Sequence, residues 1–403
     1  MDLNIPTCIV RERHKFMATK QSSIKIMLLA SITMVILWSI SSYLWPQIIY
    51  NKPATIFRDD GDFGVYFSGN GWINPNQPLY YEYPVSALLY TNWPRVFTDN
   101  FEVYHWLLWT SNALLYVLTG WLLYKLFIKF RTTTKFMWWL WILPSAIFYG
   151  LNRFDIFPVF LVILALYLVM TNRLRSGWFV YGFSIMVKLY PIFLLPLFLF
   201  FIKEKNKKFS QYAPYVLAPI IALTIGAIGA GGWLATIVPY ITQTSRGFEF
   251  GSLFSLIAMA WPNIQQYLGL ISQLGQILLP ILWWLKVVWS KTQLSLFNNI
   301  TLAAVSLLLV LTFYPFYSNQ WWLWVLPFLI LVIHPSKWWL VVLYDILNYL
   351  QYPIAFKFFW GRGSLEFNLI TLARSLVMIV IIGLLWRQLP RGWWRLGLLK
   401  FYA

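Results

Sequence analysis

The stretch DIFPVFLVILALYLVMT, residues 155–171, decides the fold class of this chain. After its first residue it carries no charged side chain. As an α-helix it would rise about 25 Å, close to the ~30 Å hydrocarbon core of a bilayer. A long uninterrupted apolar run favours a helix, because strands of a membrane β-barrel alternate apolar and polar residues. The stretch therefore predicts a transmembrane helix.

Similar apolar runs recur along the whole chain, with short polar joints between them. Hydrophobic residues make up 60% of the 403 positions and charged residues 11%, whereas about a quarter of a soluble protein is charged. We predict an all-α polytopic membrane protein, a single integral domain over residues 1–403 with about 12 transmembrane helices, in a range of 10 to 13. The predicted spans are roughly 24–44, 103–125, 136–150, 155–171, 177–188, 190–202, 212–230, 267–285, 295–313, 321–333, 338–352 and 366–386.

The net charge of +18 could suggest a nucleic-acid partner, but its distribution argues against one. With both termini in the cytoplasm, 22 of the 31 Lys and Arg residues fall on inner loops and ends and 8 on outer ones, with Arg374 inside the last span. This is the asymmetry of the positive-inside rule. We predict a multi-pass protein, surrounded by lipid, with both termini in the cytoplasm and with no nucleic-acid partner. Asp345 is a second charge inside a predicted span.

Two predicted outer segments, 45–102 and 231–266, are much longer than turns. Both are rich in aromatic residues and proline, which favours short helices at the level of the lipid headgroups. The chain has no glycine-rich nucleotide-binding motif. We therefore expect an activated substrate to arrive through the membrane.

The stretch RDDGDFGVYFSGNG, residues 58–71, places Asp59, Asp60 and Asp62 in the first long outer segment. A carboxylate there can act as a general base that takes a proton from a sugar hydroxyl. The alternative is an ordinary solvated loop. Paired aspartates can also bind Mg²⁺ or Mn²⁺, but no complete ligand set is visible, so a divalent cation stays an open alternative and no other cofactor is expected.

Transfer of a sugar from a lipid phosphate also requires cations for the departing phosphate. The outer candidates are Arg58, Arg153, Lys188 and Arg246. Lys188 lies in the joint VKLYP, where a proline interrupts the helix; it is either a cation extending to the interface or a buried cation that binds an anion. Asp155 could cap the helix that follows it or pair with Arg153.

The stretches DGDFGVY (60–66) and PLYYEYPVSALL (78–89) resemble the first outer loop of GT-C glycosyltransferases that use polyprenyl-phosphate sugars, including the enzyme that adds the first mannose to GPI anchors. Asp60 and Asp62 occupy the two acidic positions of that pattern. The second part matches at Tyr81, Tyr83 and Pro84. Bacterial polyprenol-phosphate-mannose-dependent α-mannosyltransferases have a similar Asp-x-x-Val-Tyr block, which matches here at Asp62, Val65 and Tyr66.

Two later blocks extend the resemblance. NRFDIFPVFLVILALYL (152–168) and GWFVYGFSIMVKLYPIFLLPLFLF (177–200) are similar to the bacterial Gly-Asn-x-Asp and Lys-x-x-Pro segments, at Asn152, Asp155, Lys188 and Pro191. YPFYSNQWWLWVLPF (314–328) is similar to a late outer loop. Asn319 and Gln320 stand there where some bacterial members have histidines.

The resemblance implies a GT-C-like fold and inverting transfer of a hexose, most often mannose, from a polyprenyl-phosphate donor to a lipid or glycan acceptor. Asp62 or Asp60 would be the base, and Lys188, Arg58, Arg153 and Arg246 would hold the donor phosphate. The expected substrate-binding residues are Asp59, Tyr66, Tyr81, Glu82, Tyr83, Asn152, Asp155, Tyr190, Asn319 and Gln320. Two alternatives remain, a secondary transporter and a lipid-linked glycan polymerase or flippase. A transporter would favour matched helix breaks in both halves, whereas the sequence shows one, near residue 190.

Overall fold

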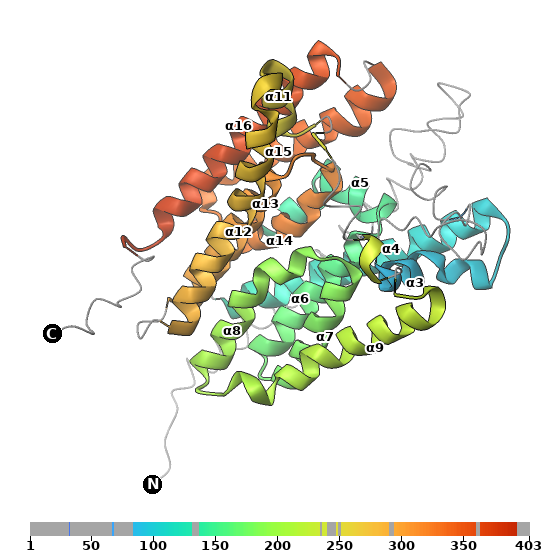
Figure 1. Cartoon of the computed structure of the whole chain (residues 1–403), viewed down its shortest axis with the longest axis vertical. Helices are drawn as coiled ribbons and strands as arrows, with labels where there is room; N and C mark the ends of the chain where they lie inside the picture. Colours follow the sequence, from blue (N-terminus) through green and yellow to red (C-terminus); the bar gives the residue numbers. More distant parts are fainter. Residues whose placement is uncertain are drawn as a thin grey trace, which may run out of the picture. The chain divides into compact units, whose positions relative to one another are not determined.

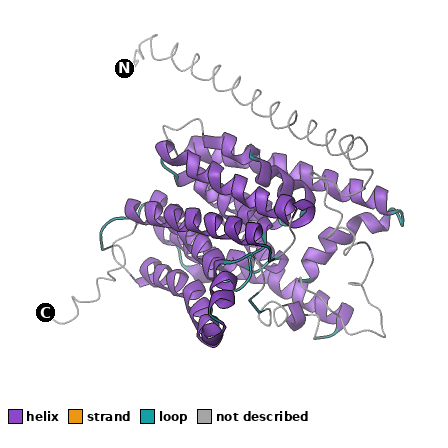
Figure 2. Ribbon diagram, turned by 90° about the horizontal axis from the view of Figure 1, so that it is seen from above, coloured by secondary structure: helices purple, strands orange, loops and turns teal. Residues whose placement is uncertain are grey.

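The computed structural model of the chain describes residues 84–130, 137–233, 236–239, 247–248, 251–289, 294–359 and 363–392, together with Ile32 and Phe67. Contacts divide the chain into two units, Met1–Phe57 and Arg58–Ala403. Within the described part of the second unit, the regular elements are all helices (Figure 2). The predicted span 24–44 lies outside the described residues except for Ile32.

The described helices follow one another along the chain (Figure 1). The α-helices are α3 (Val85–Asn92), α4 (Phe101–Lys129), α5 (Pro144–Asn152), α6 (Ile156–Met170), α7 (Leu174–Val187), α8 (Leu195–Glu204), α9 (Ala213–Gly231), α11 (Leu253–Ala260), α12 (Gln265–Trp289), α13 (Leu296–Phe313), α14 (Trp322–Val332), α15 (Trp338–Tyr349) and α16 (Leu365–Gln388). Short 3₁₀ turns are η1 (Trp93–Val96), η2 (Met137–Ile142), η3 (Tyr190–Leu194), η4 (Phe209–Gln211), η5 (Pro262–Ile264), η6 (Asn319–Trp321) and η7 (Pro335–Lys337), and η8 (Leu350–Phe359) is a π-helix.

Each predicted span from 103–125 onward coincides with a helix or with two consecutive helices. Four helical segments of the described residues are long and apolar enough to cross a membrane: Phe101–Lys129, Pro262–Trp289, Leu296–Phe313 and Leu365–Gln388. The pair α5 and α6, bent by 105°, would be a fifth. The prediction of a helical membrane protein is confirmed, while the count of about 12 spans stays a prediction.

Helix α14 lies in the interior, since all of its residues are buried. It packs against α13, α5 and α6. By contrast, α12 exposes a stripe of large apolar side chains, among them Leu270, Leu274 and Leu278. A stripe of this kind is expected of a helix that faces lipid tails.

Two helix breaks position polar groups beside α14. Helix α5 ends before Arg153, whose backbone is extended (φ −134°, ψ 140°). Helix α7 ends before Lys188, which is also extended (φ −157°, ψ 144°). The predicted break at Pro191 is confirmed, because η3 begins at Tyr190 with the proline in its first turn.

The end of α7 is held by close packing between helices. A Cβ atom on Gly182 would lie 2.3 Å from the carbonyl oxygen of Val216 on α9, so only glycine permits this approach. Helices α6 and α7 also pack side by side. These contacts fix the place of Lys188 relative to the start of α6.

Candidate active site

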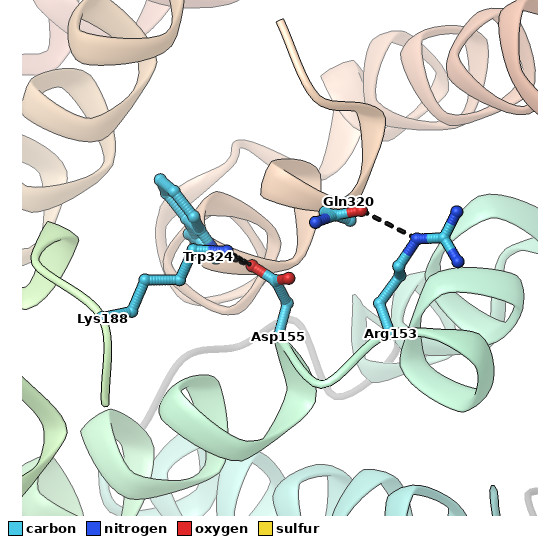
Figure 3. Close-up of polar contacts among 5 residues, drawn as sticks. All are labelled: Arg153, Asp155, Lys188, Gln320 and Trp324. Carbon is cyan, nitrogen blue, oxygen red and sulfur yellow. Dashed lines mark hydrogen bonds and ion pairs between the residues drawn. The ribbon is translucent and has the colours of Figure 1, made fainter. Parts of the chain in front are cut away.

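Asp155, at the start of α6, is the centre of a buried ion pair (Figure 3). Lys188 Nζ lies 2.6 Å from Asp155 Oδ1. The indole N–H of Trp324, on α14, donates to the same oxygen over 2.8 Å. The Asp155 side chain makes no cap hydrogen bond to α6. Both sequence-based alternatives for Asp155, capping and pairing with Arg153, were therefore wrong, and its charged partner is Lys188.

Aromatic rings enclose the Lys188 side chain, which is 12% exposed. Its Nζ lies 4.7 Å from the ring centre of Phe154 and 5.0 Å from that of Trp324. Tyr190 stacks on Trp324 with ring centres 4.4 Å apart. Such rings attract a cation through their electron-rich faces. The structure thus favours the prediction of an inward-facing cation for Lys188, which is partly buried and held by Asp155 and two rings.

Arg153 is a second cation beside α14, and it is buried. Its Nε donates to Gln320 Oε1 over 2.8 Å (Figure 3). Its Nη2 donates to the hydroxyl of Tyr352 over 3.1 Å, and Nη1 donates to the carbonyl of Asn152. Gln320 lies on η6 and Tyr352 on η8, so the guanidinium joins segments that are far apart in the sequence.

Four other predicted site residues are described by the structure, and they differ in how close their side chains lie to these two cations. Tyr190 lies beside Lys188, and Gln320 contacts Arg153. Asn152 donates from its side chain to the Phe148 carbonyl, within its own helix. Asn319 faces away from this site, since its amide donates to Asn348 and Gln351.

Asp345 explains how α5 is held in place. Its Oδ2 accepts from the backbone N–H of Ser145 over 2.8 Å, and its Oδ1 accepts from that of Ala146 over 3.2 Å. The indole of Trp322 donates to Oδ1 over 2.9 Å. A carboxylate at the first turn of a helix is favoured by the helix dipole and by the free N–H groups there. Asp345 therefore anchors the helix whose other end delivers Arg153.

Several predicted site residues lie outside the described residues: Arg58, Asp59, Asp60, Asp62, Tyr66, Tyr81, Glu82, Tyr83 and Arg246. Among the described ones, sequence reasoning missed Trp324 and Tyr352 as partners of the charged groups. Trp324 belongs to the quoted 314–328 block, whereas no sequence signal pointed to Tyr352.

The described side chains of the site, two cations and one carboxylate, favour a negatively charged ligand. In the described parts of the chain, no group of three or more His, Cys, Asp or Glu residues could hold a metal. Two cations, Lys188 and Arg153, lie on opposite sides of Asp155 (Figure 3). Buried cations at helix breaks can stabilise a phosphate as its charge grows. With the apolar helices, this arrangement defines a membrane protein with a buried charged centre of the kind that enzymes use.

The family comparison adds the chemistry. Residues 152–250 match the family model described as Mannosyltransferase (PIG-M). The matched segment begins at Asn152 and includes Arg153, Asp155 and Lys188. It indicates a glycosyltransferase of the mannosyltransferase type. A search of curated proteins and a search of solved structures found no match to the chain.

Proposed function

We propose that this enzyme transfers mannose from a polyprenyl-phosphate donor to a lipid or glycan acceptor at the outer face of a bacterial plasma membrane, with inversion at the anomeric carbon. The observation that carries the proposal is the pair of cations in the mannosyltransferase-matched segment, buried Arg153 and partly buried Lys188. A water-soluble nucleotide sugar would call for a nucleotide-binding motif, and the sequence has none. A lipid-linked donor can instead reach a buried site laterally from the bilayer.

The proposed reaction is a single displacement. The oxygen of the acceptor hydroxyl attacks the anomeric carbon as the bond from that carbon to the phosphate oxygen breaks. Asp62 or Asp60 takes the hydroxyl proton, and polyprenyl phosphate leaves with the bonding electrons. Lys188 and Arg153, with Arg58 and Arg246 from the outer segments, would stabilise the charge that develops on the phosphate.

The lysines at the other end of the helices support the proposed orientation. Lys205 Nζ donates to the carbonyl of Val169, in the last turn of α6, and Lys129 Nζ donates to that of Met170. Asp155 lies before the first turn of the same helix. Because basic residues favour the cytoplasmic side, Asp155 and the site would face outward, in an arrangement of about 12 spans with both termini inside.

Transfer of radiolabelled mannose by purified protein tests the proposal. We expect label to pass from polyprenyl-phosphate mannose to a lipid or glycan acceptor. Solute uptake into vesicles without transfer would instead indicate a transporter. Polymerisation or flipping of a lipid-linked glycan, again without mannosyl transfer, would indicate a polymerase or flippase.

The aspartate that acts as base can be identified with isosteric variants. We expect Asp60→Asn and Asp62→Asn to leave membrane insertion and thermal stability unchanged, while at least one lowers transfer by about 10²–10⁴-fold, the usual contribution of a general base. Asp99→Asn is the matched control, because Asp99 is exposed and precedes α4; it should transfer normally. Full turnover by both variants would show that the base lies elsewhere.

A further inference from the structure

Another buried cation, Arg374 on α16, lies apart from the ion pair at Asp155. Its guanidinium is fully buried, and its carbon lies 3.5 Å from the ring centre of Tyr317. Burial, and then the neighbouring Tyr344, raises the pKa of Tyr317 well above its usual range, so the ring stays neutral under the cation. A charged side chain within a membrane span is costly and is usually retained for a function.

The hydrogen-bond acceptors of Arg374 among the described residues are all neutral. Its Nη1 donates to Gln351 Oε1 and, over 3.5 Å, to Asn348 Oδ1. Its Nη2 donates to the carbonyl of Gly251. Gly251 has a φ of +97° and directly precedes Ser252, which caps α11. Arg374 thus binds the chain where the second outer segment enters a helix.

Asn319 shares the acceptors of Arg374. Its Nδ2 donates to Gln351 Oε1 over 2.9 Å and to Asn348 Oδ1 over 2.9 Å. Gln351 is held from a further side, since its Nε2 donates to Thr371 Oγ1 over 2.5 Å. The side chains of Asn319 and Gln351 are therefore fixed together against α16.

The next residue in each of these two segments contacts Arg153. Gln320 follows Asn319 and accepts from Arg153 Nε, and Tyr352 follows Gln351 and accepts from Arg153 Nη2. In the dipeptide 351–352, Gln351 accepts a hydrogen bond from Arg374 directly. In the dipeptide 319–320, Asn319 is linked to Arg374 through the acceptors that both residues share, on Gln351 and Asn348. Both dipeptides are bonded to Arg153 through their second residues. The two arginines lie at opposite ends of the same two dipeptides.

We propose that Arg374 is a positioning residue for Arg153: by fixing Asn319 and Gln351 it sets the places of Gln320 and Tyr352, and these orient the guanidinium that receives the donor phosphate. This inference rests on the proposed function of Arg153. A displacement of about 1 Å at a positioning group can cost 10²-fold in rate. A guanidinium suits the role, because its fixed fork binds two acceptors at defined angles and an ammonium does not.

The test is a double-mutant cycle in the full-length protein, with kcat/KM for polyprenyl-phosphate mannose as the readout. We expect Arg374→Gln to lower kcat/KM about tenfold and Arg374→Lys to lower it less, within the range of coupling between networked residues. Arg153→Lys should lower it at least as much. When Arg374→Gln is added to Arg153→Lys, the further loss should be under about twofold, because the orienting effect has already been removed.

A purely structural role would give another pattern. Asn299→Ala is the matched control, because buried Asn299 accepts from the indole of Trp283 over 3.0 Å in the contact of α12 with α13. Asn299→Ala should lower thermal stability. It should change kcat/KM by the same factor in the wild-type protein and in the Arg153→Lys variant. If Arg374→Gln behaves in the same additive way, the inference is wrong.

Two further measurements keep the outcome decisive. If Arg374→Gln does not fold, Gln351→Leu replaces it in the cycle, because it removes the acceptor shared by Arg374 and Asn319. Inhibition by polyprenyl phosphate should weaken in parallel with kcat/KM, and unchanged inhibition would contradict the inference. Absence of mannosyl transfer by the wild-type protein would contradict the proposed function itself, whereas normal wild-type transfer with additive variants contradicts only the role of Arg374.

Discussion

Two buried aspartates, Asp155 and Asp345, bind tryptophans of the same helix in different ways. Trp322 and Trp324, two residues apart on α14, donate to Asp345 and Asp155 respectively. The carboxylate of Asp345, a residue of α15, lies against the first turn of α5. Asp155 comes shortly after the last residue of α5. Asp155 and Asp345 are thus two equally buried carboxylates that lie at opposite ends of α5 and can be compared directly.

The difference lies in how their oxygens are satisfied. Both oxygens of Asp345 accept hydrogen bonds, and all three donors are neutral N–H groups. Asp155 has one oxygen that accepts from both Lys188 and Trp324, while its buried Oδ2 has no hydrogen-bond partner among the described residues. Leaving a buried acceptor unsatisfied costs free energy.

We expect this contrast to separate a structural carboxylate, Asp345, from a functional one, Asp155. A group such as Asp345, whose two oxygens both accept hydrogen bonds from the fold, stabilises the packing of α5. An ion-paired carboxylate with an unsatisfied oxygen, such as Asp155, is costly for stability and is the pattern found more often at functional sites. We therefore expect substitutions at Asp345 to change stability first and substitutions at Asp155 to change transfer first.

The largest effect is expected on stability at Asp345. Asp345→Ala should lower the free energy of unfolding by about 3–5 kcal/mol, because it leaves two backbone N–H groups and one indole N–H buried without an acceptor. Thermal unfolding in detergent measures the loss. Asp345→Asn, which keeps one acceptor oxygen, should lose less. Unchanged stability in Asp345→Ala would remove the distinction between the two aspartates.

The next effect is expected on transfer at Asp155. Asp155→Asn should lower kcat/KM about 100-fold, because it removes the charge that holds Lys188, with a smaller loss of stability than Asp345→Ala. Adding Lys188→Met should restore about 1–2 kcal/mol of that stability, since no uncompensated buried charge remains, but should not restore transfer. Recovery of transfer in the double variant would show that the ion pair is structural.

The smallest effects compare the two tryptophans. Trp322→Phe should lower the free energy of unfolding by about 1–3 kcal/mol, the cost of an unsatisfied buried group, with transfer close to normal. Trp324→Phe should lower transfer more than stability, because it alters the bonding of Asp155 and the ring beside Lys188. Equal effects of the two variants on both readouts would contradict the contrast.

Much of the secondary structure could be predicted from the sequence. The apolar run at 155–171 became α6, Ile156–Met170, and the proline in VKLYP marks a real helix break. Intramembrane charge also singled out Asp345 and Arg374. The partners of these groups could not be predicted, because Asp345 and Ser145 are 200 positions apart and meet only through helix packing.

The sequence alone determined that this protein is a helical membrane protein, that one helix breaks near Pro191, and which residues resemble a glycosyltransferase. These properties depend on local hydrophobicity, on the missing N–H of proline and on short motifs. Only the tertiary structure decided that Lys188 pairs with Asp155, that Asp345 anchors α5, and that Arg374 and Arg153 bind the same two segments. Those pairings depend on how separate helices pack, because a hydrogen bond forms only where packing brings a donor within about 3 Å of its acceptor.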